Sequence, residues 1–564
     1  MPIFSDLLRG HYEQSPNKVI VTMLHAGQPD LPVTYRDLIH GAAGYVKTYK
    51  QNGIQPGDVV LLILQHGVDL LYAYYGAVLH GAIPSIMPFL TEKLLPERYR
   101  ADLAGLVSVS QPTAIVTYRG FELEVRAALK PGKDSVRAVI VSDQIERPCP
   151  PQFSSLGGLR RKLEDIALLQ HSSGTTGLQK GVALSHQAVI NQLNNYGKAI
   201  HLTDADVFVS WLPLYHDMGL IACWLMPILM GNPLVLMSPF DWVRAPYRLL
   251  QAVSKYKGTL TWLPNFAYNF CSQKIRDRDL EGLNLSTWRI ISNCSEPMRW
   301  ESHQVFYERF RNLGLRYGTM GTCYAMAENV FAVTQGGVDS PVVYEDIDRE
   351  MLQTKKMAQV AQPDKITVRM MGTGKAIQNA YIRIIDPNGH NLPDRHVGEV
   401  AIQSDCMLTG YYHRIDATEK AFMDGWYLTG DYGYLVEGEL YITGRKKDLI
   451  IVGGKNIYPQ DLELLAYDVP GVHPGRASAF GVFNEITGTE DVIMVTEVDV
   501  DDPVERQMIS DAIRTVVTRG SAVTLRYIHL VRNPWLVKTS SGKTARSANR
   551  EKFLKEMQAK GQIF

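Results

Sequence analysis

The chain of 564 residues has little cysteine, no excess of either charge and no long uninterrupted apolar run. Its six cysteines are scattered, and no two are spaced as Cys-x-x-Cys. This spacing argues against a zinc ribbon or a disulfide framework and is typical of a reducing compartment. Lysine plus arginine and aspartate plus glutamate both number 58. The net charge therefore gives no reason to expect nucleic acid or an anionic membrane as a partner.

Segments that would direct the chain into a membrane are also lacking. Residues Met1 to Asp6 carry no basic stretch followed by an apolar one, so no signal peptide is predicted. The best candidate for a span, Gly219 to Met237, is broken by Pro227 and by Gly231-Asn232-Pro233. These breaks predict a buried helix that turns into a strand. We therefore expect a cytoplasmic protein without a membrane span.

The hydrophobic pattern predicts an α/β protein, and the length predicts about two to four domains. Val59 to Leu64 and Ala82 to Met87 have the apolar runs of buried strands, and Val68 to Gly81 between them has helical spacing. Such alternation predicts a sheet covered on both faces. From about residue 366, short strands such as Tyr381 to Ile385 alternate with Gly and Pro turns, which indicates an antiparallel β unit.

A loop rich in hydroxyl groups and glycine follows the apolar run Ile166 to Leu169. Such a loop presents backbone N–H and side-chain O–H donors to an anion, and Lys180 adds a point charge. The spacing differs from the Walker pattern, because no Gly-Lys-Ser/Thr opens a helix. The alternative interpretation is a flexible surface turn. The loop reads Ser172-Ser173-Gly174-Thr175-Thr176-Gly177-Leu178-Gln179-Lys180.

Further stretches combine carboxylates, lysines and aromatic residues with loop-forming glycine or proline. In chain order they are Ser210 to Gly219, Ser292 to Pro297, Tyr324 to Glu328, Trp426 to Asp431, Gly444 to Asp448 with Gly453 to Pro459, and Lys538 to Lys543.

Together with the hydroxyl-rich loop, these stretches resemble the ordered motifs of the adenylate-forming superfamily, from about residue 10 to 555. Within it the chain is most similar to fatty acyl-AMP ligases and long-chain acyl-CoA synthetases. The resemblance implies a large N-terminal domain, residues 1–443, with two packed α/β sheets and a small β-barrel. It also implies a hinge at 444–448 and a small, mobile α+β C-terminal domain, residues 449–564.

The resemblance implies ATP and Mg²⁺ as cofactors, and the residue types suit that chemistry. Glu328 offers hard carboxylate oxygen to Mg²⁺, Tyr324 offers a ring to adenine, and Asp431 accepts from ribose hydroxyls, although a turn acceptor is the alternative for Asp431. The expected ATP- and AMP-binding residues are Ser172, Ser173, Gly174, Thr175, Thr176, Gly177, Lys180, Ser295, Glu296, Pro297, Tyr324, Ala325, Met326, Asp431 and Arg445.

Three residues have expected roles in the reaction itself. Lys543 would stabilise the charge that develops at the α-phosphate and the attacking carboxylate. Lys447 occupies the position of the superfamily's hinge residue. His216 either gates the channel for the acid or is a buried histidine bonded to a carbonyl. The aromatic residues Trp262, Phe266, Tyr268 and Phe270 either line an acyl tunnel or belong to the core.

Two features give opposite indications about the acceptor of the acyl group. Glu328 and Gly374 lie 46 positions apart, and the extra residues, Val342 to Ala361, include Asp346, Asp348, Met351 and Leu352 in helix-compatible order. The fatty acyl-AMP ligases have a comparable insertion, which implies an acyl carrier protein as acceptor. The pair Gly453-Gly454 instead resembles the acyl-CoA synthetases, which use free CoA.

We therefore predict an acid–thiol ligase that converts a fatty or other apolar carboxylic acid into acyl-AMP and transfers it to a phosphopantetheine thiol of a carrier protein. The second hypothesis is an acyl-CoA synthetase. The third, of another class, is a non-catalytic protein that binds a nucleotide or acyl adenylate. The presence of both Lys543 and Glu328 speaks against the third.

Overall fold

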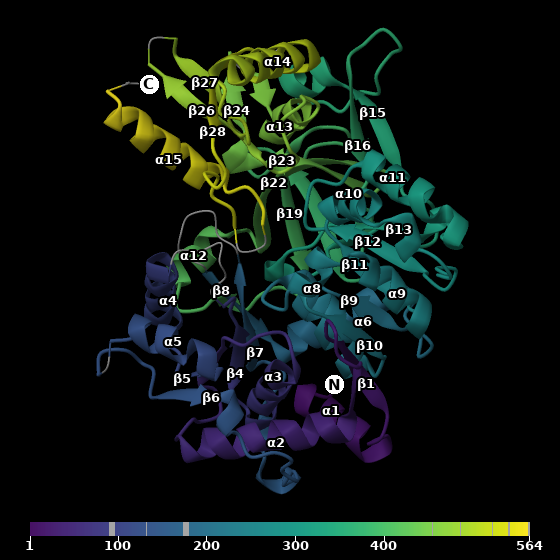
Figure 1. Cartoon of the computed structure of the whole chain (residues 1–564), viewed down its shortest axis with the longest axis vertical. Helices are drawn as coiled ribbons and strands as arrows, with labels where there is room; N and C mark the ends of the chain where they lie inside the picture. The colour runs from purple at the N-terminus through teal and green to yellow at the C-terminus, as the bar shows by residue number, and fades with distance from the viewer. Residues whose placement is uncertain are drawn as a thin grey trace.

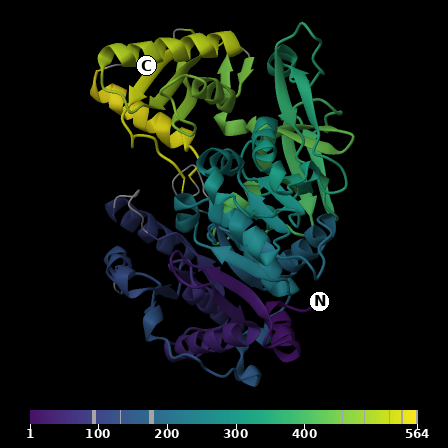
Figure 2. The ribbon, with the colours of Figure 1, turned by 45° about the vertical axis from the view of Figure 1, so that its right-hand side comes forward.

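The computed structural model describes residues 1–89, 96–130, 132–172, 180–453, 455–485, 487–521, 523–539 and 542–561. The molecule is elongated. Helices α1 and α2 lie at one end of its long axis, and the C-terminal elements α13 to α15 lie at the other (Figures 1 and 2). The predicted α/β architecture is confirmed, with several sheets and a smaller C-terminal part.

The central sheet has seven strands in the order β13-β12-β11-β9-β10-β1-β2, parallel except for β2. Strands β9 to β13 are almost entirely buried, because their apolar runs are covered on both faces. The strands are β1 Val19–Leu24, β2 Leu31–Thr34, β9 Phe208–Ser210, β10 Leu234–Met237, β11 Leu260–Leu263, β12 Ile290–Cys294 and β13 Met320–Cys323.

A second, parallel sheet has four strands in the order β4-β3-β5-β6. The strands of this sheet are β3 Val59–Leu62, β4 Ile83–Ile86, β5 Ala114–Thr117 and β6 Ala138–Val141. The helices of this part of the chain are α1 Phe4–Gln14, α2 Tyr35–Gln51, α3 Val68–His80, α4 Pro96–Ser110, α5 Glu122–Ala128, α6 His186–Ala199, α7 Met226–Met230, α8 Pro239–Arg244, α9 Tyr247–Tyr256, α10 Asn265–Lys274 and α11 Trp300–Phe310.

The apolar stretch weighed as a membrane span is buried in the protein. It forms the helical segment η5, Met218–Leu225, followed by α7 and strand β10, as its Pro and Gly breaks predict. Across the described ranges, no helix is both long and apolar enough to cross a bilayer.

The strands of two further sheets lie within the range β7 to β23. Strand β8 pairs with β7 and β20, and an antiparallel sheet follows the order β14-β17-β23-β22-β19-β18 with β21 beside β22. The strands are β7 Ile166–Ser172, β8 Lys180–Ser185, β14 Thr334–Gln335, β17 Lys375–Ala376, β18 Ala380–Ile385, β19 Gly398–Ser404, β20 Gly410–Tyr411, β21 Phe422–Met423, β22 Trp426–Val436 and β23 Glu439–Arg445. The short helix α12, Ile415–Lys420, lies beside β20.

The helix-compatible interpretation of Asp346 and Asp348 in the extra segment is wrong. Both residues lie on strand β15, Tyr344–Asp348, which pairs with β16, Thr367–Met371. The pairing satisfies the backbone groups of β15 and leaves only one helical turn, η10, Met351–Lys355. This hairpin stands beside the C-terminal part in Figure 1.

The C-terminal part has a hydrophobic core of its own, which runs from Ile450 to Leu525. It is joined to β23 by a short helical turn, η11, Lys446–Asp448. Its elements are β24 Ile450–Val452, β25 Lys455–Ile457, α13 Pro459–Tyr467, β26 Ala477–Asn484, β27 Thr489–Glu497, α14 Pro503–Ser521, β28 Leu525–Val531 and α15 Arg546–Ala559.

Candidate active site

The predicted site residues of the large part gather at one edge of the central sheet. Strands β9, β12 and β13 are parallel, and each is followed directly by one of the predicted stretches. The carboxyl ends of parallel strands meet at the same edge, which is where open α/β sheets place their ligands. The topology therefore brings together His216, Glu296 and Tyr324, which are distant in the sequence.

The pair expected to hold adenine and ribose is built from two sheets. The hydroxyl of Tyr324 donates to Asp431 Oδ2 over 2.7 Å. Asp431 lies on β22 directly opposite Arg445 on β23, with 3.5 Å from Arg445 Nε to Asp431 Oδ1. Burial raises the pKa of Asp431, and Arg445, the Tyr324 hydroxyl and Lys543 act against this shift. Asp431 is thus a strand residue with two side-chain partners and not a turn acceptor.

Glu328 lies on the turn after β13 and is half-buried. Its Oε1 accepts from the hydroxyl of Tyr411 at 2.9 Å, and Tyr411 also bonds to Tyr427 at 3.0 Å. Burial raises the pKa of Glu328, and the negative charge of Asp217 adds to this effect. A carboxylate in such surroundings is stabilised in its charged form by a nearby cation.

Lys180 contacts the same tyrosine, Tyr411. Its ammonium group lies 4.5 Å from the centre of the Tyr411 ring, a cation–π contact that fixes its direction. Strand β20 pairs with β8, and this pairing places Tyr411 next to the strand that Lys180 begins. Tyr411 thus contacts both Lys180, which is predicted to bind phosphate, and Glu328, which is predicted to bind the metal ion.

His216 is bonded to a carboxylate, which neither sequence interpretation included. Its Nδ1 lies 2.6 Å from Asp217 Oδ1, and the same oxygen accepts from the backbone N–H of Met218 at 2.7 Å. Although burial alone would raise the pKa of Asp217, the charges of His216 and Lys543 and the bond from Met218 hold it below its ordinary value. Asp217 therefore stays charged and orients the imidazole ring.

Lys543, from the C-terminal part, lies close enough to the carboxylates at the sheet edge to interact with them electrostatically. Burial lowers the pKa of Lys543, opposed by the nearby carboxylates Glu296 and Asp217. Glu296 is held in place by the backbone N–H of Phe266, at 2.9 Å. Residue 295, a serine with φ of 71°, precedes it in a strained conformation typical of functional loops.

The remaining predicted residues divide into three groups. Ala325 and Met326 follow Tyr324 in the chain and Pro297 follows Glu296, and Lys447 lies in η11, where partial burial and the cations Arg445 and Lys180 lower its pKa. The side chain of Ser172 and residues Ser173, Gly174, Thr175, Thr176 and Gly177 lie outside the described part of the chain, as does Gly454.

The aromatic residues weighed as tunnel or core differ in their burial. Trp262 and Tyr268 are fully buried core residues, whereas Phe266 is 42% exposed. Phe266 packs edge-on against the parallel stacked pair Trp211 and Trp242, whose ring centres are 3.6 Å apart. Both indole N–H groups are buried, and neither has a hydrogen-bond partner within the part of the chain that the structure describes.

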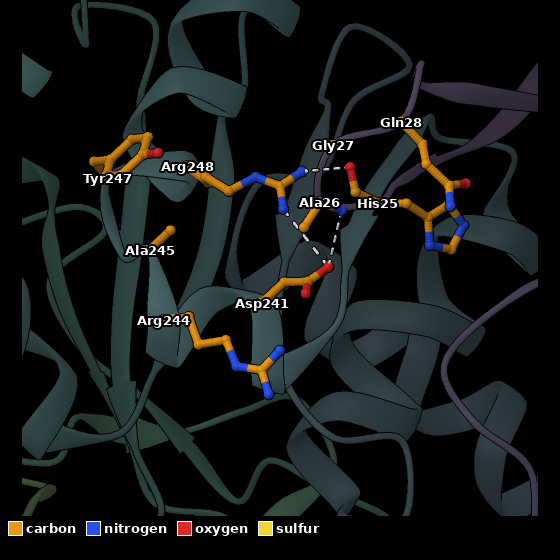
Figure 3. Close-up of a pocket in the computed structure, with 9 residues that line it drawn as sticks. All are labelled: His25, Ala26, Gly27, Gln28, Asp241, Arg244, Ala245, Tyr247 and Arg248. Carbon is orange, nitrogen blue, oxygen red and sulfur yellow. Dashed lines mark hydrogen bonds and ion pairs between the residues drawn. The ribbon is translucent and has the colours of Figure 1, made fainter.

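Two cavities differ in their relation to these residues. One, of about 520 Å³, is bordered by Lys180, Tyr411 and Lys446 and so adjoins the predicted phosphate side. The other, of about 290 Å³, lies between the turn after β1 and helices α8 and α9 (Figure 3) and contains none of the predicted residues. There Arg248 donates to the backbone carbonyl of His25 and pairs with Asp241.

The sequence did not single out Tyr411, Tyr427 or the backbone amide of Phe266 as groups that hold the predicted site residues in place. Tyr411 belongs to no predicted stretch, and only the pairing of β20 with β8 brings it to Lys180 and Glu328. Asp217 was inside a predicted stretch, but its adjacency to His216 in the sequence did not reveal that the two side chains bond.

Comparison with known proteins gives matches over nearly the whole chain. The family model for AMP-binding enzymes matches residues 8–412. The medium-chain-fatty-acid–[acyl-carrier-protein] ligase JamA of Moorena producens is 29% identical, over 98% of this chain and 96% of JamA.

Two solved structures share the fold. One, from a study of fatty acyl-adenylate ligases of E. coli and L. pneumophila, is 29% identical with a TM-score of 0.89 and covers 99% of both chains. A fatty acyl-adenylate ligase of L. pneumophila, in complex with acyl adenylate and pyrophosphate, is 31% identical over 98% of this chain and 96% of its own, with a TM-score of 0.74. By its sequence and by its fold, the chain belongs to the AMP-binding enzymes.

Proposed function

We propose that the protein uses ATP to activate a fatty acid as acyl-AMP and then transfers the acyl group to the phosphopantetheine thiol of an acyl carrier protein. The observation that carries the proposal is the convergence of Lys543 with Asp217 and Glu296 at the edge of the central sheet and with Asp431 of β22. The similarity to JamA, named for the ligation of medium-chain fatty acids to carrier protein, supports the acid and the acceptor.

In the first step a carboxylate oxygen forms a bond to the α-phosphorus of ATP, and the bond to the β-phosphate oxygen breaks. Two anions must approach each other, so the site has to offset their repulsion. Lys543 faces the reacting groups, Lys180 with the loop after β7 holds the leaving phosphates, and Tyr324 with Asp431 holds the nucleoside. His216, oriented by Asp217, borders the path of the acid.

The residues present fit a magnesium ion. Glu328 has one oxygen bonded to Tyr411 and a second carboxylate, Asp217, in its neighbourhood. Mg²⁺ is often held by one or two carboxylates together with substrate phosphates. When bound, the ion would screen the charge of the phosphates and of the leaving pyrophosphate.

For the second step we propose that residues 449–564 turn about 444–448, with Lys447 as the pivot. The separate core of the C-terminal part and the single turn η11 that joins it to β23 support such a movement. An outside carrier protein would then supply the thiol.

The segment at 342–361 supports a carrier protein over free CoA. Its buried residues Ile347, Leu352 and Ala358 pack in one cluster with Tyr441 of β23 and Tyr458 of the C-terminal part. This contact links the two parts in the arrangement described here, and we propose that it hinders the access of free CoA to the acyl group.

The test is to incubate the protein with ATP, Mg²⁺ and a panel of fatty acids, with either CoA or pantetheinylated carrier protein. Carboxylate-dependent exchange of pyrophosphate and a retained acyl adenylate in the mass spectrum are expected. Acylated carrier protein should form much faster than acyl-CoA. Efficient acyl-CoA formation would favour the synthetase alternative, for which the sequence pair Gly453-Gly454 is the supporting feature. No exchange with any acid would refute adenylation.

A further inference from the structure

A charged cavity lies beside Lys180, and none of the roles above accounts for it. It has a volume of about 520 Å³ and is walled by β20, α12, the start of β22 and the first residue of η11. In Figure 1 helix α12 lies next to β8, in agreement with the pairing of β20 with β8. Together with Lys180 of β8 and Glu399 of β19, residues from six separate elements therefore border one space.

The lining of this cavity is cationic. Four basic side chains and two carboxylates face it, namely Lys180, Arg414, Lys420, Lys446, Glu399 and Asp416. Both carboxylates are already paired. Lys446 Nζ donates a hydrogen bond of 2.7 Å to Glu399. Arg414 donates two hydrogen bonds, of 3.0 and 3.1 Å, to the carboxylate of Asp416.

Pairing of the carboxylates leaves Lys180 and Lys420 as the two positive charges without a carboxylate partner among the lining residues. Lys180 contacts the ring of Tyr411, whose hydroxyl bonds to Glu328, the proposed magnesium ligand. Lys420 is exposed at the C-terminal end of α12. A lining of positive charge thus extends from Lys180, the proposed phosphate-binding lysine, to the exposed Lys420, and forms a path towards solvent. Such a path favours a small, highly charged anion over an acyl chain or a nucleoside.

We infer that this cavity is an exit subsite for inorganic pyrophosphate, the leaving group of the proposed adenylation, on which this inference rests. Lys180 holds the anion before the bond to the α-phosphorus breaks. Lys420, with Arg414 and Lys446, holds it afterwards on its way out. A diphosphate group also occurs within ATP, so the test must separate free pyrophosphate from bound ATP.

The decisive variants are Lys420→Ala and Lys420→Glu. Lys274→Ala and Lys274→Glu serve as matched controls, because Lys274 is an exposed lysine at the last position of helix α10, away from the cavity. The substrate in one arm is pyrophosphate, which converts enzyme-bound acyl adenylate back to ATP. In the other arm ATP is varied in a single forward turnover.

We expect Lys420→Ala to raise the KM for pyrophosphate about threefold to tenfold, and Lys420→Glu to raise it further. The inhibition constant of added pyrophosphate should rise by the same factor, while the KM for ATP changes by less than about twofold. Equal increases for ATP and pyrophosphate would overturn the exit subsite, because they would place Lys420 at the bound triphosphate. Unchanged constants in both Lys420 variants would overturn it as well.

Direct calorimetric titration with magnesium pyrophosphate separates this inference from the proposed function. If the wild-type protein adenylates no acid but binds pyrophosphate more weakly after Lys420→Glu, adenylation fails and the subsite stands. If it adenylates normally and the titrations of wild type and Lys420→Glu coincide, the subsite fails and adenylation stands. The unfolding temperature of each variant confirms that it is folded.

Discussion

Lys543 carries the charge on which the proposed first step depends most. Its replacement by alanine should slow acyl-AMP formation by about 10²- to 10³-fold, which corresponds to roughly 2.7–4 kcal/mol in the barrier, because a preorganised cation facing the reacting groups is lost. Single-turnover measurement with radiolabelled ATP checks this expectation. Lys555→Ala, an exposed lysine on α15, should leave the rate unchanged. Equal rates for wild type and Lys543→Ala would contradict the assignment.

The pH dependence of the same step follows from the shift at Lys543. Burial lowers the pKa of its ammonium group, so the charged form is lost at a lower pH than for a free lysine, whose pKa is about 10.4. The rate of adenylation should therefore fall on the alkaline side earlier than expected for an exposed lysine. In Lys543→Arg this alkaline decline should disappear, because arginine stays charged. A decline that persists in the arginine variant would assign it to another group.

Asp217 predicts a pH-dependent contribution to stability. The pKa of its buried carboxyl is lowered in the folded protein, so its contribution is present above the ordinary pKa of about 3.9 and is lost as the pH falls through the folded value. Asp217→Asn should reduce the free energy of unfolding by about 1–3 kcal/mol at pH 7. Urea titrations should show this difference shrinking below about pH 4. The exposed Asp204→Asn should have little effect at any pH, and a constant difference for Asp217→Asn would point to lost packing instead.

Among the secondary-structure elements, the hairpin β15–β16 with η10 has the clearest functional consequence. Leu352 of η10 is 2% exposed and packs with Tyr458 of the C-terminal part. Leu352→Ala should destabilise this contact by about 2–5 kcal/mol and increase acyl-CoA formation relative to wild type. Chromatography of the thioester products with CoA as the only acceptor provides the measurement.

A matched control lies in the same segment. Val360 is 50% exposed, so Val360→Ala should change stability by no more than about 0.5 kcal/mol and leave the choice of acceptor as in wild type. If Leu352→Ala adenylates normally but still rejects CoA, the hairpin does not set the acceptor.

The elements also show what the sequence could predict. Buried strands such as β3 and β10 follow from uninterrupted apolar runs, and the antiparallel β unit predicted after about residue 366 is confirmed, for example by β18 and β19. Strands β1 and β2 were not predicted, and β1 joins the central sheet beside β10, more than 200 residues later in the chain. Hydrophobic periodicity reports burial, but it does not report which strands pair.

The site shows the same limit. The motif order predicted that Tyr324, Asp431 and Arg445 belong to one site, and the structure brings their side chains together. The contribution of Tyr411 depends on the pairing of β20 with β8, and no local pattern encodes that pairing. Asp346 and Asp348 had helix-compatible spacing, yet they form a strand because Thr367–Met371 supplies the partner.

For the molecule as a whole, Arg546 links the joint to the C-terminal part. It pairs with Asp448 at 3.0 Å and with Glu463 of α13 at 2.6 Å, and all three side chains are mostly buried. Arg546→Met leaves two carboxylates without their cation and should lower the free energy of unfolding by about 3–5 kcal/mol. Denaturation in urea measures the loss, and proteolysis near 444–448 should become faster.

The surface pair of Arg526 and Asp491 provides the comparison for Arg546. Arg526 is 70% exposed and lies 3.9 Å from its partner, so Arg526→Met should change stability by at most about 1 kcal/mol. Similar losses in the two variants would show that the buried network around Arg546 has no special role in holding the joint.

The cross-strand pairing of Asp431 with Arg445 has a consequence for inhibitor design. The pairing of β22 with β23 holds these two residues opposite each other, and the proposed pivot, Lys447, lies two residues beyond Arg445. A compound that grips both side chains would therefore keep its anchor throughout the catalytic cycle. A substitution that only alters the orientation of the C-terminal part would therefore not give resistance. Resistance would require a substitution of Asp431 or Arg445.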